Sequence, residues 1–278
     1  DFIETIRFWI IKKMTLVSVI MPAYNSQAYI EASINSVIKQ TYSCWELIII
    51  NDGSTDNTSE IANKFIQTDK RIKVISQENQ GETAARNTGL ANASGKYIAF
   101  LDSDDLYMDT FLEKMVSRIQ TGNCDAVYCG FKNIRENMNM GEPYAEGNIL
   151  ECYSIQKQHI WIVAFMIKKS FLEQYRITFT PSVTLGGDQE FIGLCGVFAQ
   201  VKAVPEVLTI YQNNPVSMSN TISFKKRKED ILARDRVLAR IHQQFNSPYK
   251  NEVITYFKKI RDGMVLFCKN AVWDAIKS

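Results

Sequence analysis

The segment Asp102–Asp105 places three carboxylates within four residues, directly after the apolar run Tyr97–Leu101. Acids this close repel one another and resist burial unless a bound cation offsets their charge. Hard oxygen ligands favour Mg²⁺ or Mn²⁺, which commonly bridge protein carboxylates to a substrate diphosphate. The pattern therefore indicates either a metal site at the end of a buried strand or a loop whose Asp caps a helix beginning near Asp109.

Two further polar turns follow apolar runs. Pro22 and Tyr24 come after the first run, and Asp52 follows the run Leu47–Ile50. The ring of Tyr24 could stack on a nucleobase, and the carboxylate of Asp52 could accept the hydrogen of a uracil imide. The alternative for Asp52 is a plain turn in which Asp56 caps the next helix.

The segment Gly81–Gly89 sets one cation, Arg86, among small residues. We expect a helix here that leads into the strand before the acids, and its small side chains would allow close packing on a sheet. Arg86 could then meet a phosphate or brace an acid. The alternative is a surface arginine on a tightly packed helix.

The chain between these motifs alternates from Leu16 to Leu101 between β-branched runs and amphipathic segments. The expected strands are Val17–Met21, Leu47–Ile50, Ile72–Ile75 and Tyr97–Leu101. The expected helical faces carry Ile30, Ile34, Val37 and Ile38, and then Ile61, Phe65 and Ile66. Strands so apolar are typical of a parallel sheet covered by helices, where ligands bind beyond the carboxyl ends of the strands. The sequence thus predicts an α/β fold with its motifs at one sheet edge.

The alternation weakens beyond Asp125. We expect a strand at Ala126–Cys129, a polar connection over Lys132–Asn148 and an apolar run at Ile160–Ile167. This second half should shape an acceptor site.

Together the motifs resemble, in order and spacing, the family 2 glycosyltransferases with a GT-A fold. The N-terminal half of that family typically reads S-V-I-x-P-x-Y-N, D-D-G-S-x-D, G-x-x-x-A-R-N-x-G and D-x-D-D. The corresponding segments here are Ser18–Asn25, Asn51–Asp56, Gly81–Gly89 and Asp102–Asp105. The resemblance covers residues 16 to 110 firmly and residues 111 to 215 loosely.

The resemblance implies transfer of a sugar from a nucleotide diphosphate, usually a UDP-sugar, with inversion at the anomeric carbon. It implies a donor-binding set of Pro22, Tyr24, Asp52, Arg86, Asp102 and Asp104. Asp102 would face the ribose or the sugar, and Asp104 would bind Mn²⁺ or Mg²⁺ as a Lewis acid for the leaving diphosphate. Asp105 is a rival metal ligand.

Inversion also needs a base, which the family usually carries in an E-D pair. Asp188 matches the Asp of that pair, whereas Gly187 replaces the Glu, and Glu190 is a possible substitute. Without the resemblance, Asp188 would be read as the cap of a helix that continues through Phe198.

A second departure lies in the segment Tyr211–Ser219, which resembles the family's Y-R-x-x-x-x-S-x-S pattern. Gln212 stands where Arg is common, and Lys225 or Lys226 could supply the missing charge. The alternative is a loop that follows a strand at Val207–Tyr211.

The bulk properties, 278 residues of which 46% are hydrophobic, fit one large domain or one domain plus an appendage. The six cysteines are scattered and form no zinc or disulfide pattern. Residues 1–13 are an extension, either a helix or foreign to the fold. Residues 14–220 form the catalytic domain, with a nucleotide-sugar half to about 110, and 221–278 a basic helical region. No apolar stretch reaches the length of a membrane span and no secretory signal is evident, so we expect a cytoplasmic protein.

The net charge of +2 is unevenly distributed, because residues 225–278 hold 13 Lys or Arg against 6 Asp or Glu. A basic amphipathic helix there suits either an anionic membrane surface or packing on the body with a solvated basic face. Nucleic acid is disfavoured, because aromatic and basic residues do not interleave.

The prediction is an inverting, metal-dependent hexosyltransferase of the bacterial polysaccharide or lipopolysaccharide type. It would form a β-linkage to a glycan or a lipid-linked oligosaccharide, at the inner face of the membrane. The alternatives are a non-catalytic sugar-nucleotide-binding protein and a sugar nucleotidyltransferase, although the latter should carry a Gly-rich basic loop after the first strand.

Overall fold

The structure is a computed structural model that describes residues 14–134, 137–140, 144–147, 160–183, 187–196, 198–212 and 214, with the helical residues 251, 254, 255, 258 and 262. Within these residues, nine strands form one sheet in the order β3-β2-β1-β4-β8-β6-β9-β5, and β7 pairs with β6. The elements are β1 (Val17–Ala23), α2 (Ile30–Ile38), β2 (Trp45–Asp52), α3 (Thr58–Thr68), β3 (Ile72–Gln77), α4 (Glu82–Asn92), β4 (Tyr97–Phe100), β5 (Leu106–Tyr107), α5 (Phe111–Thr121), β6 (Ala126–Asn133), β7 (Met138–Met140), a 3-10 turn (Ile162–Ala164), β8 (Phe165–Lys168), α7 (Lys169–Gln174), α8 (Gly187–Gly196) and β9 (Val201–Tyr211).

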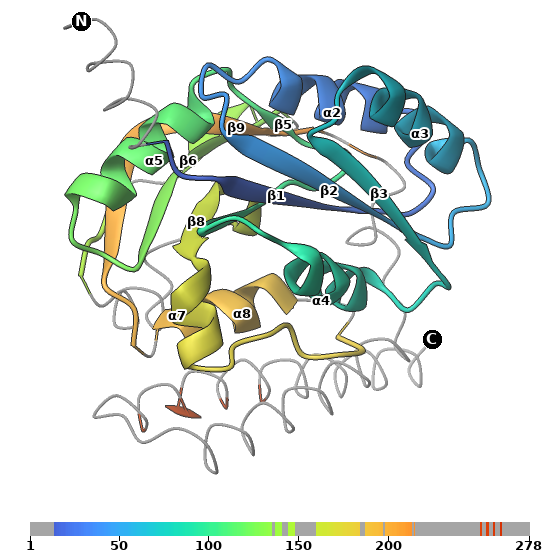
Figure 1. Ribbon diagram of the computed structural model, residues 1–278. Coiled ribbons are helices and arrows are strands. Elements are labelled where there is room, and N and C mark those ends of the chain that lie inside the picture. The colour runs from blue at the N-terminus through green and yellow to red at the C-terminus, as the bar shows by residue number, and fades with distance from the viewer. Residues whose placement is uncertain are drawn as a thin grey trace, which may run out of the picture.

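The first half is the predicted parallel sheet. Strands β1, β2, β3 and β4 run parallel, and their apolar residues are buried between two layers of helices. Figure 1 shows α2 and α3 on one face of this sheet and α4, α7 and α8 on the other. The predicted α/β class is therefore confirmed.

Strand boundaries extend beyond the predicted runs. β1 includes Pro22, which lies opposite Ile50 of β2, because the pairing with β4 stops at Ile20 and the missing N–H of proline is not needed there. β2 likewise runs on to Asp52, so this acid lies at the end of a strand and not beyond it.

In the second half, a strand that runs antiparallel to its neighbours joins the sheet. β8 pairs antiparallel with both β4 and β6, and β9 pairs parallel with β6. Because two reversals restore the original direction, β6 and β9 end at the same sheet edge as β4. The sequence missed β5 and β7, and it placed the start of β9 at Val207, whereas the strand begins at Val201.

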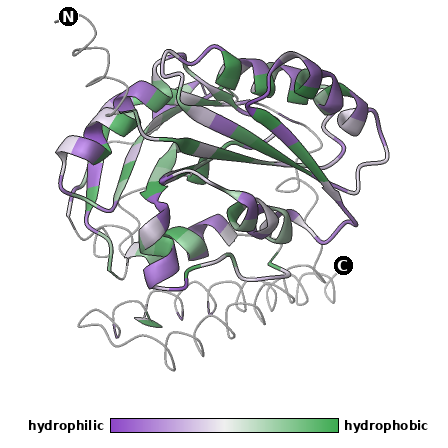
Figure 2. Cartoon of the chain, viewed as in Figure 1, coloured by the Kyte–Doolittle hydropathy of each residue, from purple (hydrophilic) through white to green (hydrophobic). Residues whose placement is uncertain are grey.

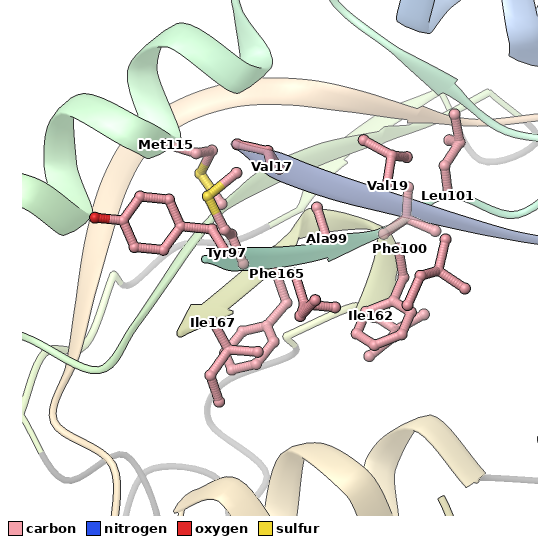
Figure 3. Close-up of a cluster of buried hydrophobic side chains, with 14 of the residues drawn as sticks. Val17, Val19, Tyr97, Ala99, Phe100, Leu101, Met115, Ile162, Phe165 and Ile167 are labelled. Atoms are coloured by element: carbon pink, nitrogen blue, oxygen red, sulfur yellow. The ribbon is translucent and has the colours of Figure 1, made fainter. Parts of the chain in front are cut away.

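Hydropathy follows this architecture. Figure 2 shows hydrophobic residues along the central strands, whereas α2 and α3 carry hydrophilic residues on their outer side. Figure 3 shows the core around β4, with Phe165 and Ile167 on the side of α8 and Val19 and Leu101 on the opposite side. Both faces of β4 are thus covered, and the polar segment that follows it lies at the edge of the core.

Two predicted regions lie outside the described residues: the extension 1–13 and the basic segment that opens at Lys225. Of the C-terminal region, the described residue Ile254 is buried and belongs to the core cluster. A search of the described helices for one that could span a membrane finds none.

Candidate active site

The acids that follow β4 lie at the edge where β9 ends. Asp105 is 1% exposed, and one of its carboxylate oxygens accepts a hydrogen bond from Gln212 N at 3.0 Å. Asp104 accepts a bond from Asn214 Nδ2 at 2.9 Å. The strand reversals described above explain this meeting, because they bring the end of β9 to the end of β4. The helix-capping alternative is not supported, since α5 begins at Phe111 with no side-chain cap.

Arg86 lies on α4 and joins acids from three parts of the chain. Its Nη2 donates to Glu82 Oε1 and to Asp102 Oδ1, both at 2.7 Å, and its Nη1 donates to Asp188 Oδ1. The side chain has no exposed surface, so the surface-arginine alternative is wrong. Of the two roles left open by the sequence, the structure shows Arg86 bracing acids.

Aromatic residues pack against Arg86. Its guanidinium carbon lies 5.3 Å from the ring centroid of Phe179, which stacks on Phe191 of α8 at 4.2 Å. Asn87 fixes Phe179 in turn, because it both donates to and accepts from its backbone at 2.9 Å. Sequence reasoning missed Asn87 and Phe179, although Asn87 adjoins Arg86 within one motif.

The site carries an excess of negative charge. Three carboxylates contact the Arg86 guanidinium and those of Asp104 and Asp105 interact with Asp102 nearby, for a formal charge of −4 when all five are ionised. Burial, followed by the charge of Asp102, raises the pKa of Asp104 and of Asp105. An added cation would therefore favour the ionised form of both groups.

The carboxylate oxygens are the hard ligands that Mg²⁺ and Mn²⁺ prefer, and the charge excess matches a divalent ion. In the part of the chain that the structure describes, no three His, Cys, Asp or Glu side chains converge into a complete metal site. A cation held by Asp104 and Asp105 would thus need further oxygen ligands, such as those of a diphosphate or water.

The residues expected to hold the nucleobase lie at the same edge, where β1 and β2 end. Tyr24 is 50% exposed, as a stacking surface requires, and Pro22 is buried in β1. Asp52 is buried, and its carboxylate accepts bonds from Gln77 Nε2 at 2.7 Å and from two backbone N–H groups, the nearer of them Gly81 N at 2.8 Å. Asp52 thereby ties the end of β2 to the start of α4.

The two turns that hold these residues are hydrogen-bonded to each other. Asn25, at φ 48°, accepts from Thr55 N at 2.8 Å and donates through its own N–H to Ser54 Oγ at 3.1 Å. Asp56 accepts a bond at 2.9 Å from the backbone N of Thr58, the first residue of α3, whereas the N-cap position itself is Asn57 and not Asp56. The loops after β1 and β2 thus form one connected edge.

Asp188 lies in the first turn of α8, and its carboxylate contacts Arg86. Burial raises its pKa against the opposing effect of the guanidinium. Gly187 precedes it, and Glu190, the possible substitute base, is 1% exposed in the core side of the same helix. The helix ends at Gly196, short of Phe198. Of the loop that begins at Tyr211, the residues after Asn214 lie outside the described part.

The comparisons with known proteins agree with this architecture. The family model described as Glycosyl transferase family 2 matches residues 18–177, more than half of the chain. An Escherichia coli protein named UDP-Glc:alpha-D-GlcNAc-diphosphoundecaprenol beta-1,3-glucosyltransferase WfgD is 38% identical over 165 residues, which are 59% of this chain and 64% of that protein.

Two solved structures share the fold. Staphylococcus aureus TarS 1-349 in complex with UDP-GlcNAc has a TM-score of 0.73 at 20% identity, covering 88% of this chain and 71% of that one. The mannosyltransferase PcManGT from Pyrobaculum calidifontis, in complex with GDP-Man and Mn²⁺, has a TM-score of 0.63 at 19% identity, covering 94% and 75%. With its motifs, its sheet and the family match in agreement, the chain belongs to glycosyl transferase family 2.

Proposed function

We propose that the chain transfers a hexose from a UDP-sugar, with inversion, to a hydroxyl group of a lipid-linked diphosphate sugar. The observation that carries this proposal is Arg86, which joins Asp102 after β4 to Asp188 at the start of α8. Arg86 thereby links the part expected to bind the nucleotide sugar to the expected catalytic base, Asp188. The glucosyltransferase named above acts on a diphosphoundecaprenol-linked sugar, which supports the acceptor class.

In the proposed reaction, Asp188 takes the proton of the acceptor hydroxyl group, and the oxygen of that hydroxyl group attacks the anomeric carbon. The bond from that carbon to the diphosphate breaks, and the nucleoside diphosphate leaves with the bonding electrons. The raised pKa of Asp188 favours this role, because a more basic carboxylate accepts a proton more readily. Arg86 keeps the carboxylate oriented.

The proposal includes a divalent cation held by Asp104 and Asp105. When bound, the cation would neutralise charge on the leaving diphosphate. Tyr24 would stack on the nucleobase, and Asp102 would face the ribose or the transferred sugar. The charge excess among the carboxylates supports this assignment, and so does the Mn²⁺ in a structure of the same fold.

The test uses UDP-glucose with GlcNAc-diphosphoundecaprenol, alongside thermal stabilisation by UDP and Mn²⁺. Asp188→Asn should lower transfer about 100-fold or more and keep the stabilisation by UDP with Mn²⁺, because the base acts only in the chemical step. Asp104→Asn should lose the Mn²⁺-dependent part of that stabilisation. Transfer by Asp188→Asn at the wild-type rate would remove Asp188 from the mechanism.

The control is Asp109→Asn, because Asp109 is exposed and its backbone carbonyl accepts a bond from Thr41 N at 2.9 Å. It should keep both transfer and stabilisation. Failure of UDP, UDP-glucose and GDP-mannose alike to stabilise the wild-type chain would contradict the proposed donor class. Slow metal-dependent release of UDP without acceptor would exclude the non-catalytic alternative.

A further inference from the structure

Helix α8 begins where it touches α4, at Gly187. A Cβ atom on Gly187 would lie 2.7 Å from Thr83 Cγ2, closer than such atoms approach in proteins. Thr83 is itself buried and cannot easily give way. The position that carries the Glu of the E-D pair in related sequences therefore has no room for a side chain here.

Glu82, the neighbour of Thr83, brings a carboxylate to the same place from the other helix. It lies in the first turn of α4, and a third of its side chain is exposed. Its Oε1 accepts a bond from Arg86 Nη2 at 2.7 Å. Among the described residues no other group donates to this carboxylate.

The electrostatic surroundings show which space Glu82 faces. Burial, together with the charges of Asp102, Asp188 and Asp104, raises the pKa of Glu82 to about 8 against the opposing effect of Arg86. Glu82 shares the Arg86 guanidinium with Asp102 and with Asp188. It therefore lies between the expected nucleotide side and the expected base, which is where a sugar undergoing transfer has to be.

We propose that Glu82 is a specificity-determining residue that accepts a hydrogen bond from a hydroxyl group of the transferred sugar. The inference rests on the proposed function. A second consequence follows from its charge, because a carboxylate on the sugar would meet Glu82 and Asp188 at close range. The site should thus take neutral hexoses and reject uronic acids.

The experiment measures dissociation constants of UDP, UDP-glucose and UDP-glucuronate by calorimetry with Mn²⁺ at pH 8.5, where Glu82 is mostly ionised. The wild-type chain should bind UDP-glucose about tenfold more tightly than UDP-glucuronate, because the carboxylate of glucuronate is repelled by Glu82. Glu82→Gln should reduce that preference to about twofold and leave the affinity for UDP within about twofold.

The matched control is Glu60→Gln. Glu60 also lies in the first turn of a helix and pairs with a cation four residues on, Lys64, at 3.0 Å, but it is far more exposed. This variant should keep the wild-type preference for UDP-glucose.

Two results would overturn the inference while the proposed function stands. An unchanged preference in Glu82→Gln would show that Glu82 does not face the sugar, and an equal loss of affinity for all three ligands would show that it only supports Arg86. Failure of the wild-type chain to bind any of the three would instead overturn the proposed function, and the inference with it.

Discussion

At the scale of single residues, the candidate site depends on a buried cation and not on the acids alone. Arg86 has no exposed surface, and its Nη atoms bond carboxylates on α4, after β4 and on α8. Its Nε has no partner among the described residues. A buried guanidinium is tolerated here because several acids compensate its charge, so the acids and Arg86 need one another.

We therefore expect Arg86→Lys to destabilise the fold. A lysine ammonium cannot reproduce the planar set of donors, so at least one buried contact is lost, at a cost of about 3 kcal/mol. Urea unfolding measures this cost. The control is Arg71→Lys, because Arg71 pairs with Asp69 at 2.6 Å but is 38% exposed, and this change should cost about 1 kcal/mol or less. Equal losses in both variants would show that the cluster does not stabilise the fold.

Most residues of the candidate site could be predicted from the sequence, whereas the hydrogen bonds between them could not. Asp52 ends β2, Arg86 lies on the helix after β3 and the acids at 102–105 follow β4, and the carboxyl ends of these parallel strands share one edge. The role of Arg86 stayed open because its partner Asp188 lies 102 residues away, in a region without clear alternation. The sequence did not single out Glu82, because its proposed role depends on how closely α8 approaches α4.

At the scale of elements, the depth at which α4 packs sets the position of Arg86. A Cβ atom on Gly89 would lie 2.3 Å from Ile20 Cγ2 of β1. The missing side chain lets the helix approach the strand closely. Glycine normally weakens a helix by about 1 kcal/mol relative to alanine, so close packing has to outweigh that loss.

Gly89→Ala should consequently destabilise the chain, despite the better helix propensity of alanine. Overpacking of this kind costs about 1–3 kcal/mol. Urea unfolding of Gly89→Ala, Ile20→Ala and the double variant forms a mutant cycle that isolates the contact. The cost of the alanine should fall to near zero once Ile20 is truncated. A cost that is the same in both backgrounds would place the strain elsewhere.

The elements of the second half were predicted least well, for a physical reason. The strands of the first half are mostly apolar and alternate with helices, so local pattern suffices to find them. β5 is only Leu106–Tyr107, and it forms because β9 offers an edge from more than a hundred residues away. Strand pairing over such distances leaves no local signal.

At the scale of the whole molecule, charge is separated along the chain. The net charge of +2 and the count of 13 basic against 6 acidic residues in 225–278 leave the rest of the chain negative. The carboxylates around Arg86 add negative charge at the sheet edge that carries the candidate active site. A lipid-linked acceptor would lie at an anionic membrane surface, which attracts clustered Lys and Arg at about 1 kcal/mol per residue. We propose that the basic segment brings the enzyme to its acceptor.

The full chain should accordingly sediment with vesicles that contain anionic lipid and not with neutral vesicles, and added salt should weaken the binding. Replacing Lys225, Lys226, Arg227 and Lys228 by Gln should lower the partition coefficient at least about tenfold, because four charges are removed from one segment. The control replaces the exposed Lys39, Lys64, Lys70 and Lys96 by Gln, which removes the same charge from the catalytic domain. If both quadruple variants lose binding equally, overall charge and not the basic segment governs the attraction. Transfer to a water-soluble acceptor should be unchanged in the control variant, because its substitutions do not touch the carboxylates around Arg86.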